Sequence, residues 1–150
     1  MARIRKFLLL PGRERLLLVQ ATFLLVVIRV GLSLVPFRML RRLLVRLARA
    51  DKTSKAPRQS DIDRVIWALK AAGRTFPLAG TCLTEALAGY ALLGRKGYST
   101  DLRIGVTRDA EGRFLAHAWL EKGDLIVIGQ IGAEHERYIP FPAIRGLGPF

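Results

Sequence analysis

The fold is decided by the stretch AGTCLTEALAGYALL at residues 79–93, together with LRIGV at residues 102–106. In the first stretch, apolar residues recur every three to four positions, and Thr81 stands ahead of them as a helix N-cap. In the second stretch, apolar residues occupy every second position, which is the period of a strand. The change of period predicts a helix followed by a sheet, and it places Cys82 in the first turn of a buried helix.

Further strands are expected after this point. Residues 114–121 and 125–131 form a predicted hairpin around a tight turn at Lys122 and Gly123. A short edge strand is expected at residues 138–141, because a proline within a strand confines it to a sheet edge. Helices that precede antiparallel strands in this way indicate the α+β class.

Three helices are predicted ahead of the cysteine helix. The first extends from about residue 13 to a proline at position 36, and an arginine-rich amphipathic helix covers residues 37–49. Residues 51–60 are polar, lack periodicity and are interpreted as a linker. Ser60 and Asp63 then form a capping-box-like start for a helix that ends near residue 73.

Positive charge is concentrated in the N-terminal third of the chain. Residues 1–50 hold 11 Lys and Arg against one acid, whereas residues 51–150 hold 14 bases and 11 acids. A basic patch of this kind can bind nucleic acid, anionic lipid or an acidic protein. Because its arginines alternate with runs of leucine rather than with stacking aromatic residues, nucleic acid is the least favoured of the three.

The same region contains a strongly apolar segment. Residues 16–28 form an apolar run of 13 residues, against the ~20 needed to cross a bilayer, and any extension includes Arg29. An arginine at mid-membrane costs ~2.5–3.5 kcal/mol on insertion scales. No small-x-small site for a signal peptidase follows. We expect burial of this helix pair within the domain or a complex, with membrane contact as the alternative.

Composition excludes several classes of protein. A chain of 150 residues fits one domain, and a hydrophobic content of 51% excludes an intrinsically disordered protein. One cysteine cannot form an internal disulfide, which favours a reducing compartment, the cytoplasm. One cysteine and two histidines are also too few for an ordinary four-ligand zinc site, so no metal or cofactor is expected.

Cys82 and His117 are the residues most able to carry chemistry. A free cysteine is most often a small buried hydrophobe. At a helix N-terminus, however, the helix dipole favours the thiolate, and the unsatisfied N–H groups can bind an oxyanion. His117, in the middle of a predicted strand, is either an ordinary half-exposed histidine or the general base for this thiol. His135 lies among charged residues and is expected in a solvated loop.

Two segments together resemble a known family. They are GTCLTEALAGYALLGRKGYSTDLRIGV at residues 80–106 and FLAHAWLEKGDLIVIG at residues 114–129. Both are similar to the leader peptidases of lasso-peptide biosynthesis, which belong to the transglutaminase-like, papain-related cysteine peptidases. The preceding basic, apolar region resembles the N-terminal part of these proteins. With the basic apolar helical region at residues 1–50 and the linker at 51–60, the resemblance implies that residues 61–150 are a transglutaminase-like peptidase domain.

The resemblance also implies an activity, in which Cys82 is the nucleophile and His117 the general base for removal of a leader peptide. The family commonly has an aspartate about a dozen residues after the histidine, where this chain has Gly129. A two-residue turn at Lys122 and Gly123 would pair Glu121 with Asp124 and His117 with Ile128. In that register Gln130 is the diagonal neighbour of His117, so it is either the third catalytic residue or an ordinary polar residue at a strand end, whereas Asp124 lies too far away.

Partners follow from the same resemblance. Leader recognition in this family uses a winged-helix module, and residues 1–50 show no strand pattern for one. We therefore expect a precursor peptide as substrate, a separate leader-binding protein, and the lasso cyclase as a further partner. Two alternatives stay open from the sequence: a transglutaminase-like acyltransferase that uses the same Cys–His pair, and a non-catalytic basic protein that binds a membrane or nucleic acid.

Overall fold

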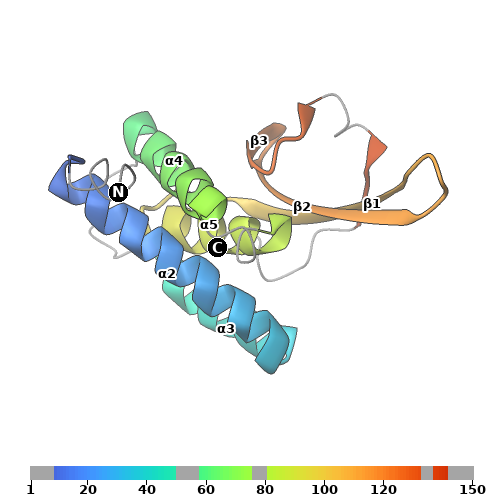
Figure 1. The fold of residues 1–150 in the computed structure, drawn as a ribbon, viewed down its shortest axis with the longest axis horizontal. Helices are drawn as coiled ribbons and strands as arrows, with labels where there is room; N and C mark the ends of the chain where they lie inside the picture. Colours follow the sequence, from blue (N-terminus) through green and yellow to red (C-terminus); the bar gives the residue numbers. More distant parts are fainter. Residues whose placement is uncertain (1–8, 50–57, 76–80, 133–136, 142–150) are drawn as a thin grey trace.

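The structure is a computed structural model, and it describes residues 9–49, 58–75, 81–132 and 137–141. Within them, helices come first and a four-stranded antiparallel sheet follows, which confirms the α+β class. Figure 1 shows the helices gathered at one end of the molecule, with the sheet extending away from them.

The two N-terminal helices form where the sequence predicted them. Helix α2 spans Gly12–Leu34 and helix α3 spans Phe37–Ala48. Each begins directly after a proline, Pro11 or Pro36, whose carbonyl oxygen accepts hydrogen bonds from the first turn. The inner face of α2 is buried against α4 and α5, and α3 packs mainly on α5. Both helices therefore contribute to the same hydrophobic core as the later elements.

Helix α4 spans Gln59–Thr75 and begins two residues before the first helical residue that a Ser60 N-cap predicts. Ser60 is thus a residue of the first turn rather than the N-cap, so the capping-box prediction is wrong. The side chain of Gln59 instead donates a hydrogen bond of 3.0 Å to Asp63, one turn further along. Most of the predicted linker, namely its residues 51–57, lies outside the described residues.

Helix α5 spans Cys82–Arg95 and is the central element of the core. Gly89 faces the sheet, and a Cβ atom at this position would lie 3.0 Å from Cδ1 of Leu120 and still closer to Cδ1 of Ile128. The absence of a side chain therefore allows the helix to approach strands β2 and β3 closely. At the C-terminal end of α5, Gly94 has the same function toward Ala48 of α3.

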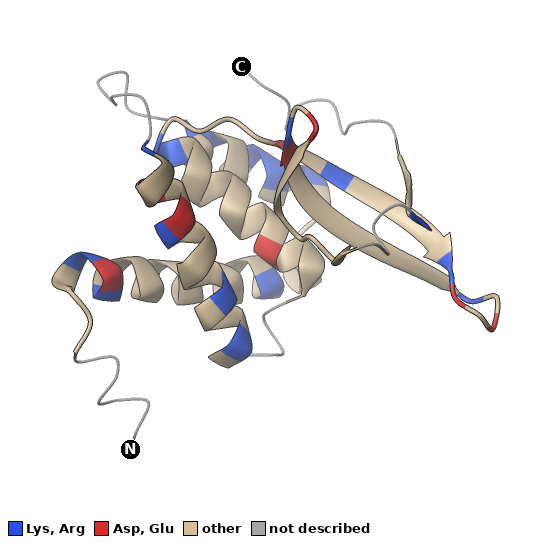
Figure 2. Ribbon diagram, turned by 90° about the horizontal axis from the view of Figure 1, so that it is seen from above, with Lys and Arg blue, Asp and Glu red and all other residues tan. Residues whose placement is uncertain are grey.

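The sheet has the strand order β3-β2-β1-β4. Strands β1 (Asp101–Arg108) and β2 (Phe114–Lys122) pair over their whole length, with Gly105 opposite His117. Their hairpin projects beyond the helices, and its tip carries charges of both signs (Figure 2). Strand β4 (Ile139–Pro140) pairs with β1 at the sheet edge, where the short strand was expected.

The predicted register of β2 and β3 (Leu125–Ile128) is wrong. The turn consists of Gly123 and Asp124, so Lys122 pairs with Leu125 rather than Glu121 with Asp124. Gly123 has a φ of +60°, and a glycine at the first turn position suits the hairpin turn with a positive φ there. A register shift then pairs Ile128 with Leu120 instead of His117, and β3 ends at 128 rather than 131.

Candidate active site

Cys82 is the first residue of α5, and its helix start is capped as the sequence predicted. The Thr81 hydroxyl accepts a hydrogen bond of 3.3 Å from the backbone N–H of Thr84 and lies 2.6 Å from the Thr84 hydroxyl. The thiol is free and half-buried. Because the first N–H groups of a helix have no partner within the helix, those of Cys82 and Leu83 are suited to holding an oxyanion.

His117 is held in a fixed orientation by the chain that follows β3. Its ring is buried, with 9% of the residue exposed, and its Nε2 lies 2.6 Å from the carbonyl oxygen of Gly129. A carbonyl oxygen can only accept a hydrogen bond, so Nε2 carries the proton and donates. In the neutral ring, Nδ1 is consequently the basic nitrogen.

Two aromatic side chains enclose the imidazole. Trp119 stacks on it at a ring distance of 6.1 Å, and Tyr138 approaches it at 5.5 Å in a tilted arrangement. Gly105, opposite His117 in β1, leaves the necessary room, because a Cβ atom there would lie 2.9 Å from the Trp119 ring. The histidine therefore lies in an aromatic environment that limits its rotation.

Trp119 is itself fixed by an ion pair. Its Nε1 donates a hydrogen bond of 3.1 Å to Glu121, and the other carboxylate oxygen of Glu121 accepts one of 2.6 Å from Nε of Arg103. Both side chains of this ion pair are half-buried. This arrangement explains the AHAWLE motif at residues 116–121: the histidine, the tryptophan that stacks on it and the glutamate that fixes the tryptophan share one face of β2.

Gly129 occupies the position at which the resemblance led us to expect an aspartate. Its φ of +90° lies in the region that favours glycine, and a Cβ atom would lie 2.9 Å from both the Ala118 carbonyl oxygen and Cβ of Trp119. This backbone conformation cannot accommodate a side chain without moving. Sequence reasoning missed the residue because it searched for a side chain, whereas the group that reaches the histidine is a backbone carbonyl.

The other expected candidates for the third position lie on the surface. Gln130 is exposed and follows the end of β3, and Asp124 is exposed in the hairpin turn. The register on which the expectation for Gln130 depended does not occur, but its catalytic role itself stays a prediction. His135 lies outside the described residues.

The two principal candidates lie on adjoining elements. Helix α5 packs on β2, and the strand residue that faces Gly89 of the helix is Leu120. His117 alternates with Ala118 and Leu120, so its ring lies on the other face of the strand, beside Trp119. Cys82 begins the helix, and His117 lies in the middle of the strand.

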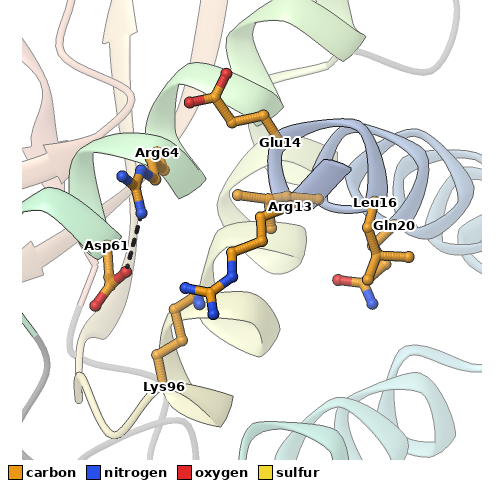
Figure 3. Close-up of a pocket in the computed structure, with 8 residues that line it drawn as sticks. Arg13, Glu14, Leu16, Gln20, Asp61, Arg64 and Lys96 are labelled. Carbon is orange, nitrogen blue, oxygen red and sulfur yellow. Dashed lines mark ion pairs between the residues drawn. The ribbon is translucent and has the colours of Figure 1, made fainter. Parts of the chain in front are cut away.

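A separate hollow of about 300 Å³ lies at the opposite end of α5, between that end and helices α2 and α4. Arg13 and Lys96 lie close together on one side of it, and Arg64 forms an ion pair of 3.7 Å with Asp61 (Figure 3). A 14-residue helix is ~21 Å long, so this basic hollow is distant from Cys82. Within the described ranges, no cluster of His, Cys, Asp and Glu could hold a metal ion.

Comparison with known proteins agrees with this architecture. The model of the transglutaminase-like superfamily matches residues 24–142, from the middle of α2 to just beyond β4. Neither the curated proteins nor the solved structures gave a match. The matched region contains both Cys82 at the start of its helix and His117 in its strand. With most of its length matched in this way, the chain belongs to the transglutaminase-like superfamily.

Proposed function

We propose that the protein is a cysteine peptidase that removes the leader peptide from a lasso-peptide precursor. The superfamily includes cysteine peptidases and acyltransferases, so membership supports thiol chemistry in general. The narrower proposal rests on the resemblance of residues 80–106 and 114–129 to the leader peptidases. The observation that carries it is the placement of the two residues that the resemblance names: Cys82 begins α5, and His117 lies in β2, the strand on which α5 packs.

The proposed reaction begins with the thiol of Cys82. In this scheme Nδ1 of His117 accepts its proton, a step that requires the thiol and the imidazole to be brought together from opposite faces of β2, and the thiolate attacks the scissile carbonyl carbon. The backbone N–H groups of the first turn of α5 stabilise the resulting oxyanion. As the C–N bond breaks, His117 returns the proton to the leaving amine, and a thioester remains on Cys82. His117 then removes a proton from water, which hydrolyses the thioester and regenerates the thiol.

In this scheme the Gly129 carbonyl orients the histidine, which is the function of the third catalytic residue. It orients the imidazole by accepting the Nε2 proton, as a side-chain amide does in Cys-His-Asn enzymes. A carbonyl carries only a partial negative charge, so it stabilises the imidazolium less than an aspartate would. The aromatic contacts of Trp119 and Tyr138 supplement it by restricting the ring.

We also propose that substrate delivery depends on a second protein. The described helices and strands all belong to one core and its sheet, and α2 and α3 form part of that core. A separate winged-helix protein would bind the leader and present the cleavage site to Cys82, and the lasso cyclase would receive the product.

Mass analysis of a precursor peptide tests this proposal. A candidate precursor encoded near the gene for this chain is incubated with the purified chain, with and without the leader-binding protein encoded nearby. We expect cleavage that requires the leader-binding protein, with water added at the new C-terminus, and no cleavage by Cys82→Ala. Glu111→Ala, at the exposed hairpin tip, is the control variant.

Three results would contradict the proposal. Cleavage by Cys82→Ala would exclude the thiol as nucleophile. Full activity of the chain without the leader-binding protein would exclude the delivery step. A product that carries an added amine in place of water would identify an acyltransferase.

A further inference from the structure

Helix α2 exposes an apolar face to solvent along its whole length. This outer face of α2 consists of large apolar side chains that are each 40% to 76% exposed, namely Leu16, Val19, Phe23, Val26, Val27, Val30 and Leu34. They follow the helical period and lie opposite the buried face formed by Ala21, Leu25 and Ile28. A surface helix of a globular protein normally carries polar and charged residues on its outward face. Apolar patches of this extent mark interaction sites.

Helix α3 adds a second apolar row with basic residues beside it. Met39, Leu43 and Leu47 are 45% to 55% exposed at intervals of four residues. Each of these three residues follows an arginine that is also exposed, namely Arg38, Arg42 and Arg46. Because side chains four apart lie on one side of a helix, the apolar row and the arginine row run in parallel. Figure 2 shows basic residues recurring along the helices.

We infer that the outer face of α2 and the arginine row of α3 bind the surface of an anionic membrane. Apolar side chains at the boundary between headgroups and acyl chains, with arginines at the level of the phosphates, are typical of interfacial helices. The positive charge of this region complements an anionic membrane, since residues 1–50 hold 11 Lys and Arg and a single acid. Long arginine side chains can also reach the headgroups while their stems cover apolar surface.

The packing of α2 argues against a transmembrane position for the folded protein. By length and composition the helix could cross a bilayer, with a mean hydropathy of 2.2 over its most apolar window. Its inner face, however, is packed against α4 and α5. Crossing would take charged residues of α4, such as Arg64 and Lys70, into the hydrocarbon, which is costly. The helix therefore lies in the plane of the membrane surface.

Charge also argues against a second copy of the chain as the partner that covers the outer face of α2 and the arginine row of α3. In a symmetric dimer the same patch faces itself. Two such regions, each with a net charge of +10, would oppose one another across the interface. Repulsion between like charges would weaken that association, whereas an anionic bilayer satisfies both the apolar and the basic residues.

Vesicle cosedimentation of the full chain tests the inference. Vesicles of phosphatidylcholine alone are compared with vesicles that contain phosphatidylglycerol. We expect binding to the anionic vesicles, weakened at least about tenfold by Arg38→Glu with Arg42→Glu and Arg46→Glu. Phe23→Gln with Val30→Gln should weaken it similarly. Phe114→Gln with Ile139→Gln replaces two apolar residues on the sheet that are more exposed than Phe23 and Val30, and this matched control should bind as the unaltered chain does.

A tryptophan probe keeps the test valid if the glutamine variants do not fold. The chain already contains Trp67 and Trp119, so the emission of each variant is compared with that of the unaltered chain. The emission that Phe23→Trp adds should shift to the blue on addition of anionic vesicles, and that added by Phe114→Trp should not. The inference is overturned if the unaltered chain does not bind anionic vesicles, or if the α2 and α3 variants bind as well as the control. Cys82→Ala should bind normally, so failure of the proposed peptidase activity would leave this result unaffected.

Discussion

Nε2 of His117 donates a hydrogen bond of 2.6 Å to the carbonyl oxygen of Gly129, twelve residues further along the chain. This bond links the middle of β2 to the segment that follows β3, and it fixes both the orientation of the ring and the nitrogen that carries its proton. In the proposed peptidase, a backbone atom thus performs the orienting function for which the family commonly uses an aspartate.

The first prediction concerns this bond. Gly129→Ala should lower kcat by about a hundredfold, because the new Cβ forces the Gly129 carbonyl away from His117 and displaces the base. Initial rates of precursor cleavage measure the effect. Gly132→Ala is the control, since Gly132 also has a positive φ, of +68°, but no neighbouring atom within 4 Å of the added carbon.

Gln130→Ala distinguishes the carbonyl from the amide as the orienting group. If Gly129 orients the ring, this variant of an exposed residue should keep nearly full activity and lose much less than His117→Ala. An inactive Gln130→Ala enzyme beside an active Gly129→Ala enzyme would assign the orienting role to the amide instead.

The second prediction concerns the ion pair behind Trp119. Glu121→Ala should lower kcat about tenfold with little change in KM, because Trp119 loses its acceptor and no longer restrains the imidazole. Glu121→Gln keeps an oxygen for Trp119 and should recover most of the activity. Equal losses in the two variants would show that the charge of the ion pair with Arg103, rather than the orientation of Trp119, is what matters.

The third prediction concerns Glu85 in the first turn of α5. Burial raises the pKa of this carboxyl above its ordinary value of 4.5, and the charge of Lys70 offsets only part of that effect. The folded protein therefore binds the proton more tightly than the unfolded chain, so stability is lost as the pH rises above the ordinary pKa of 4.5, and the full cost is present above the folded pKa. Glu85→Gln should raise Tm at pH 7, and this gain should disappear below about pH 4.

Thermal unfolding at several pH values measures this effect. Glu111→Gln, at the exposed hairpin tip, provides the comparison for removal of an acidic charge. A Glu85→Gln protein that melts at the same or a lower temperature than the unaltered chain at pH 7 would contradict the prediction.

The fourth prediction concerns the contact of α3 with α5. Gly94→Ala should lower the free energy of unfolding by about 1–3 kcal/mol, because its Cβ would lie 2.7 Å from the Ala48 carbonyl oxygen and force the helices apart. Denaturant unfolding measures the loss. Gly12→Ala places the same methyl group in open space and should cost nothing. If the free energy of unfolding of Gly94→Ala is unchanged, α3 can move away from α5 at no cost to make room for the added methyl group.

Local signals were sufficient to predict the helices and the class of fold. Pro11, Pro36 and the Thr81 cap mark where helices begin, and each acts on its own first turn. The change from a helical to an alternating period identified β1 and β2 in the same way. These features depend on neighbouring residues only, so a single sequence contains the information.

The register of β3 and the environment of His117 could not be predicted with the same methods. A one-residue error in the position of the turn, at Gly123 and Asp124, changes every pair beyond it. The irregularity after Leu120 depends on tertiary packing. Tyr138 and the Gly129 carbonyl reach the histidine only once the sheet has formed, and a backbone acceptor has no signature among side chains.

The rate at which iodoacetamide alkylates the thiol at pH 6 tests the central claim, that His117 activates Cys82, most directly. Cys82 is the sole cysteine, so each added carbamidomethyl group detected by intact mass spectrometry reports this one site. The account predicts that the unaltered chain reacts at least about tenfold faster than His117→Ala, because the imidazole holds the proton that the thiolate has lost. Equal rates for the two proteins would contradict it.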